Sequence, residues 1–64
     1  MEILRKTTED NKPTFHVRTN LGLIIKIKAA PEMDETEINQ LLEYVANDMD
    51  NKLKSNIEQL KHAI

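Results

Sequence analysis

The last half of the chain carries an apolar repeat of eleven residues. Between Glu35 and Ile64 there is neither glycine nor proline, so no residue of this stretch is a strong helix breaker. Apolar residues recur eleven apart in three series, which are Ile38, Met49 and Leu60; Leu42, Leu53 and Ile64; and Ala46 and Ile57. Eleven residues in three turns give about 3.67 residues per turn, close to the pitch of a straight helix. The sequence therefore predicts one long helix over 35–64, with an apolar stripe along one face.

The residues at both ends of this segment fit helix termini. Asp34 followed by Glu37 is typical of a capping box with Asp34 as the N-cap. Lys61 and His62 fall in the last turn, where the helix dipole favours positive charge. The weak point is the stretch 47–51, which has poor helix propensity. A hinge there would give two shorter helices that fold back on each other, whereas the unbroken eleven-residue phase favours one continuous helix.

Two acidic residues in the middle of the helix stand four positions before lysines. Asp48 precedes Lys52 and Asp50 precedes Lys54, the favourable order for i,i+4 ion pairs. Asp48 and Asp50 lie on different sides of a helix, so they do not form a natural pair of acid and base. We expect both carboxylates on the solvated surface of the helix.

The first half of the chain predicts a β-hairpin. Thr14–Thr19 and Leu23–Lys28 alternate apolar and polar residues, and Asn20-Leu21-Gly22 lies between them. A three-residue loop, with Gly22 in the left-handed conformation, pairs Thr19 with Leu23 and sets Val17 against Ile25 and Phe15 against Ile27. A two-residue loop would set the same apolar residues against lysines, so the hydrophobic pattern selects the three-residue loop. One face is then apolar, and the other carries Thr14, His16, Arg18, Ile24, Lys26 and Lys28.

Two segments around the hairpin complete the expected fold. Residues 2–8 form either a third strand, joined to the hairpin through residues 9–13, or a loose arm, because the adjacent Ile3 and Leu4 break the alternation. Pro13 fits the start or the edge of a strand. The connection 29–34 contains Pro31, which prevents an earlier helix start. We therefore expect a single α+β domain over 1–64, with a small antiparallel sheet in 1–28, a connection over 29–34 and one long C-terminal helix over 35–64.

This fold leaves the distal part of the apolar stripe, from Leu53 to Ile64, uncovered. A helix of thirty residues is about 45 Å long, whereas a strand of six residues spans about 20 Å. The chain has 64 residues and no cysteine, so a monomer would be marginally stable and could not be stapled by disulfides. Self-association as a homodimer or a higher oligomer, through the helices, is the remaining source of stability. The residues we expect at this interface are Leu42, Val45, Met49, Leu53, Ile57, Leu60 and Ile64.

Charge is distributed unevenly along the chain. Residues 1–28 carry six basic and three acidic groups, whereas residues 29–64 carry three basic and eight acidic groups. Both halves are consistent with ordinary solvated surfaces. A sharper interpretation assigns nucleic-acid binding to His16, Arg18, Lys26 and Lys28, which share one face of the hairpin. The acidic residues around the helix start are the other candidate, as a partner-binding surface formed by Glu32, Asp34, Glu35 and Glu37.

The sequence shows no constellation of catalytic residues. One glycine cannot build a phosphate-binding loop, Ser55 is the only serine, and His16 and His62 are isolated. We therefore expect no enzymatic activity, no cofactor and no metal. No apolar run approaches a membrane span, and no signal peptide follows Met1, so we expect a cytoplasmic protein without membrane contact. The predicted function is a protein-interaction module, a homodimer that regulates or inhibits a larger protein, with nucleic-acid binding as the alternative.

Overall fold

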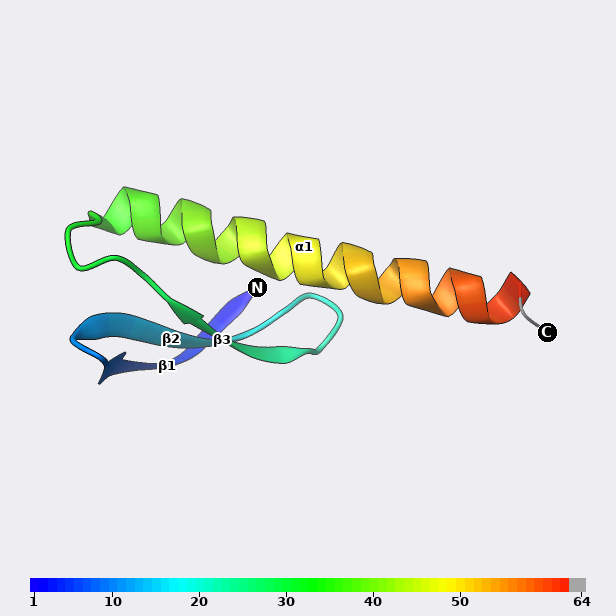
Figure 1. Cartoon of the computed structure of the whole chain (residues 1–64), viewed down its shortest axis with the longest axis horizontal. Helices are drawn as coiled ribbons and strands as arrows, with labels where there is room; N and C mark the ends of the chain where they lie inside the picture. The colour runs from blue at the N-terminus through cyan, green and yellow to red at the C-terminus, as the bar shows by residue number, and fades with distance from the viewer. Residues whose placement is uncertain (63–64) are drawn as a thin grey trace.

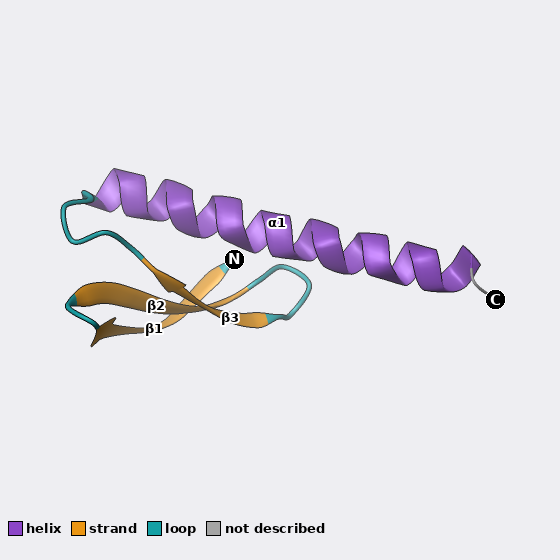
Figure 2. Ribbon diagram, viewed as in Figure 1, coloured by secondary structure: helices purple, strands orange, loops and turns teal. Residues whose placement is uncertain are grey.

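The chain forms a three-stranded antiparallel sheet followed by one long helix, as the α+β prediction requires (Figure 1). The computed structural model describes residues 1–62, with side chains through residue 57. The strands are β1 (Glu2–Glu9), β2 (Lys12–Arg18) and β3 (Ile24–Lys28), and β2 is the central strand. The helix is α1 (Glu35–His62), which lies across one face of the sheet and continues beyond it (Figure 2). The molecule measures 46 × 19 × 18 Å, and its long axis follows this helix.

The hairpin of β2 and β3 has the predicted register. Phe15 pairs with Ile27, Val17 with Ile25, and His16 with Lys26. The Thr19 N–H donates to the Leu23 carbonyl at 2.8 Å, which closes the three-residue loop, and Gly22 has a φ of 90°. The hydrophobic pattern therefore identified both the partner residues and the one loop position that needs a positive φ.

Residues 2–9 form β1, so the third strand is confirmed and the loose arm is not formed. The connection to β2 is shorter than the predicted 9–13, because Glu9 still pairs with Lys12 and only Asp10 and Asn11 remain in the turn. Both turn residues have positive φ, 53° and 62°, which is the type I′ geometry of two-residue hairpins. Asp and Asn tolerate this conformation better than other non-glycine residues.

A bulge in β1 resolves the broken alternation at its start. Ile3 pairs with Val17, whereas Arg5 pairs with His16, so Leu4 is an extra residue between two regular stretches. Such a bulge lets two adjacent apolar residues occupy one strand without shifting the rest of the register. The side chains of Ile3 and Leu4 are both exposed.

Pro13 lies in the central strand, next to its first residue. The Pro13 carbonyl accepts a hydrogen bond from the Ala29 N–H at 2.8 Å, so this side of Pro13 faces the chain just after β3 ends at Lys28. The N–H that proline lacks would point to the same side, where no further β3 residue needs a donor. A proline is therefore tolerated in this central strand.

The core lies between the sheet and the first half of the helix. It consists of Phe15, Val17, Ile27, Ala29 and Leu42, with Ile25, Met33, Ile38, Leu41 and Val45 packed against it. The helix packs mainly on β2 and β3, so the part of the sheet face formed by β1 is less covered. Ile24 is 65% exposed on the opposite face, as expected for the isolated apolar residue among cations.

The helix begins at the predicted cap and runs without a break. The Glu37 N–H donates to Asp34 Oδ1 at 2.8 Å, and the Asp34 N–H donates to Glu37 Oε1 at 3.3 Å, which is the reciprocal pattern of a capping box. Helical structure continues through 47–51 to His62, so the hinge alternative is not adopted. Within residues 1–62, no helix has the length and apolar character needed to cross a membrane.

Candidate interaction surface

The apolar face of α1 extends past the part of the helix that the sheet covers. Among the helix side chains that the structure describes, which end at residue 57, the buried ones are Leu42, Ala46 and Asp50. Beyond them Leu53 is half-buried and Ile57 is 45% exposed. Figure 1 shows α1 continuing well past the loop between β2 and β3. We call residues 53–62 the overhang, because the chain's own sheet ends before this segment.

The predicted interface residues divide into two groups. Leu42 is fully buried and Val45 is packed against the core, so both side chains already contribute to the chain's own core. Met49 and Leu53 are half-buried, and Ile57 is exposed. The side chains of Leu60 and Ile64 lie outside the described residues. The surface that remains open for a partner is therefore the distal part of the predicted stripe, beginning at Leu53.

Asp50 joins the helix to the β2–β3 loop. Its Oδ2 accepts a hydrogen bond from the Leu21 N–H at 3.3 Å, and its side chain is only 6% exposed. The prediction of a solvated Asp50 paired with Lys54 is therefore wrong, whereas Asp48 and Lys52 form the predicted ion pair at 3.1 Å. The position of Asp50 in the helical repeat does indicate that its side chain is buried. Asp50 stands four residues after Ala46 and three before Leu53, on the buried side of the helix.

The Asp50 contact brings an apolar side chain to the base of the overhang. Leu21 at the tip of the loop is 44% exposed, although its backbone is held against α1. Leu53 follows Asp50 by three residues and lies on the same side of the helix. The loop tip and the overhang thus present Leu21, Leu53 and Ile57 around one end of the sheet.

The arginine and the two lysines proposed to bind nucleic acid are each paired with a carboxylate. Arg18 contacts Glu2 at 3.2 Å, Lys26 contacts Glu9 at 3.1 Å, and Lys28 contacts Asp10 at 2.9 Å. Each of these acids lies in β1 or in the turn after it. The sequence left open whether β1 forms, so it could not predict these ion pairs. His16 is half-buried and stands between Arg5 and Lys26 in the strand pairing. The face is therefore a set of ion pairs, with fewer free cations than its lysines and arginines suggest.

The ion pair of Asp10 and Lys28 changes the acidity of both groups. The hydrogen bond and charge of Lys28 lower the pKa of Asp10, and the same contact raises the pKa of Lys28. The ion pair therefore stabilises the fold at pH values between the pKa of Asp10 and the pKa of Lys28. It is lost as the pH falls through the lowered pKa of Asp10, and again as the pH rises through the raised pKa of Lys28.

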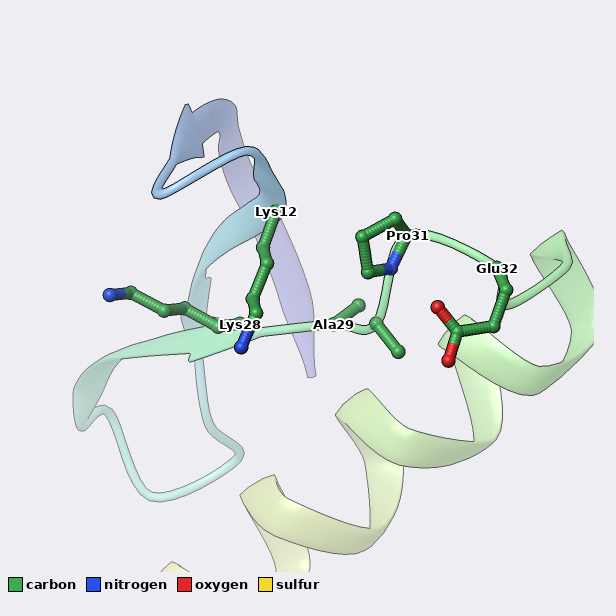
Figure 3. Close-up of a pocket in the computed structure, with 6 residues that line it drawn as sticks. Lys12, Lys28, Ala29, Pro31 and Glu32 are labelled. Atoms are coloured by element: carbon green, nitrogen blue, oxygen red, sulfur yellow. The ribbon is translucent and has the colours of Figure 1, made fainter.

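A shallow hollow of about 370 Å³ lies where β3 leads into the connection to α1. Its walls are Lys12 and Lys28 on the sheet side and Glu32 on the other side, with Ala29, Ala30 and Pro31 between them. Figure 3 shows the Lys28 side chain extending away from Pro31 and Glu32. Because Lys28 pairs with Asp10 and Glu32 brings a negative charge, the hollow does not form a concentrated anion site.

The acidic residues near the helix start have different surroundings. Asp34 and Glu37 form the capping box, so one carboxylate oxygen of each already accepts a backbone hydrogen bond. Glu32 lines the hollow described above. Glu35 borders a second depression of about 360 Å³ between β1 and the first turns of α1, lined by Ile3, Lys6, Phe15, Glu35, Ile38 and Asn39. We call this depression the β1 groove.

The described residues contain no group of three His, Asp or Glu side chains that could hold a metal ion. Comparisons of the chain with family models, with curated proteins and with solved structures find no match in any of the three.

Proposed function

We propose that this protein is a non-enzymatic interaction module that acts as a homodimer and regulates or inhibits a larger protein in the cytoplasm. The observation that carries the proposal is the overhang, an apolar helix face that its own sheet leaves open at Leu53 and Ile57. Burying one such side chain stabilises a complex by about 1.5–3 kcal/mol. A chain of 64 residues gains substantially from covering this face, because its own core is small.

Nucleic-acid binding remains the alternative function, with less support. Binding to a duplex depends on lysines and arginines that can replace counterions along the phosphates. Arg18, Lys26 and Lys28 each already contact a carboxylate, and these ion pairs would have to open before the cations could bind phosphates.

The homodimer is tested by replacing the first residue of the overhang with a charge. Leu53→Asp places a carboxylate in the proposed interface, so light scattering should report a dimer for the wild type and a monomer or an unfolded chain for the variant. Ser55→Asp is the matched control, because it adds the same charge two residues away at an exposed position. A wild-type protein that is monomeric at micromolar concentration, with a cooperative unfolding transition, would overturn the proposed assembly.

Two binding measurements separate the functional classes. In a pull-down from cell extract, the wild-type chain is the bait. A module that acts on another protein should then retain one discrete partner protein. The alternative predicts strong binding to random duplex DNA that weakens steeply between low and moderate salt. Strong DNA binding without a retained protein would favour the alternative and contradict the interaction module.

A further inference from the structure

Resting on the proposed homodimer, we infer that the overhang of each copy occupies the β1 groove of the other, with the two helices antiparallel. The occupant of the groove is therefore a second copy of this chain. The contact is reciprocal, because a twofold axis repeats it at both ends of the helix pair.

The β1 groove is a partly apolar depression that the chain leaves open at Ile3. Ile3, Phe15 and Ile38 form its apolar part, while Lys6, Glu35 and Asn39 are its polar lining residues. Because α1 packs mainly on β2 and β3, Ile3 remains 46% exposed at this position. Lys6 places its ammonium 5.8 Å from the centre of the Phe15 ring, so a cation borders the apolar part of the groove. An apolar helix face can cover such a surface.

The groove and the overhang lie at opposite ends of the same helix. Glu35 and Ile38 border the groove in the first turns of α1, and Ile57 lies about 28 Å further along at 1.5 Å per residue. In an antiparallel pair, the N-terminal end of one helix lies beside the C-terminal end of the other. One symmetric contact therefore covers both open apolar surfaces of each chain.

Charge selects the antiparallel orientation. In residues 35–49 the helix carries four acidic groups and no lysine or arginine, whereas residues 50–64 carry three lysines and two acidic groups. One of those two acids is the buried Asp50. Antiparallel helices set the acidic half of each copy against the basic half of the other, while parallel helices would set like charges together. The helix dipoles also favour the antiparallel arrangement.

The two ends of the helices match across such an axis. With the twofold axis near residues 47–48, Ile57 of one copy lies beside Ile38 of the other. Ile38 is half-buried and lines the groove, and Ile57 is exposed. Both side chains retain surface that a second copy can cover.

Cysteine cross-linking tests this arrangement, because the natural chain contains no cysteine. The variants are Ile57→Cys in the overhang and Asn39→Cys in the groove, two positions that are exposed in the single chain. The two variants are mixed, equilibrated and treated with a short bismaleimide, and mass spectrometry identifies the linked peptides. Tyr44→Cys replaces Asn39→Cys in the control mixture, because Tyr44 is 72% exposed and lies away from the core-facing side of the helix.

The inference predicts a link between positions 39 and 57 that exceeds the link between 44 and 57 several-fold. Links mainly between two copies of position 57 would show that the overhangs pack on each other, which overturns the groove contact and leaves the homodimer standing. A dimeric mass without a 39–57 link above the control also overturns the groove contact. A monomeric mass for the unlinked protein overturns the homodimer itself.

Discussion

The Asp50 carboxylate lies between α1 and the β2–β3 loop, where Oδ2 accepts the Leu21 N–H and Oδ1 is buried without a hydrogen-bond partner among the described residues. Asp50→Ala removes the acceptor, so we expect the free energy of unfolding to fall by about 1–3 kcal/mol. Hydrogen exchange at the Leu21 amide should accelerate in particular. Asp50→Asn keeps an acceptor oxygen and should lose less stability.

Asp48→Ala is the matched control for the Asp50 variants. It removes a partly exposed acid from the same helix, and its ion pair with Lys52 should contribute no more than about 0.5 kcal/mol. Unchanged protection of the Leu21 amide in Asp50→Ala would show that this hydrogen bond does not hold the loop.

Gly22 and Asp50 illustrate which roles of single residues can be predicted from the sequence. Gly22 was predictable, because a hairpin loop of this length needs a positive φ and the chain has one glycine to supply it. Asp50 was predicted on the solvated surface, because aspartate side chains are mostly exposed, although its helical phase places it on the buried side of α1. A carboxylate can occupy a buried helix position when a backbone N–H from another segment reaches it, and that contact depends on where the loop lies in three dimensions.

The first turn of α1 depends on a reciprocal pair of hydrogen bonds between Asp34 and Glu37. Asp34→Ala removes the cap, and such changes cost about 1 kcal/mol in proteins. For a chain of this size, that loss lowers the melting temperature by roughly 4–8 °C. Thermal unfolding followed by circular dichroism measures the shift. Thr36→Ala, one residue before Glu37 and exposed, should leave the melting temperature nearly unchanged.

Whole elements were predictable wherever a period or a pairing rule constrained them. Alternation selected the register of β2 and β3, and the absence of Gly and Pro predicted the continuous helix. The connection between β1 and β2 was predicted over 9–13 and is shorter, because Asp10 and Asn11 adopt the positive φ of a type I′ turn, which glycine usually supplies. The position of β1 across the sheet set the ion pairs of Arg18, Lys26 and Lys28, so these followed from tertiary structure rather than from local pattern.

At the scale of the whole molecule, a helix of 28 residues extends along most of the 46 Å length while the sheet supports only its first half. Length alone predicted this mismatch, because a strand residue and a helix residue advance the chain by known distances. The same lengths predicted that the sheet covers the first half of the stripe and leaves it open from Leu53, and Ile57 is indeed exposed. Length could not predict the contact between Asp50 and the β2–β3 loop, which marks the end of the covered region.

A homodimer should make the thermal stability of this chain depend on its concentration. Unfolding of a dimer releases two chains, so a hundredfold rise in protein concentration stabilises each dimer by roughly 2.7 kcal/mol. For two chains of 64 residues, this raises the melting temperature by on the order of 10 °C. Wild type and Ser55→Asp should both show the shift in calorimetry, whereas Leu53→Asp, if it still folds, should melt at one temperature throughout. A wild-type melting temperature that stays constant over this range would mean that folding and association are independent, and the overhang would then contribute nothing to the stability of the fold.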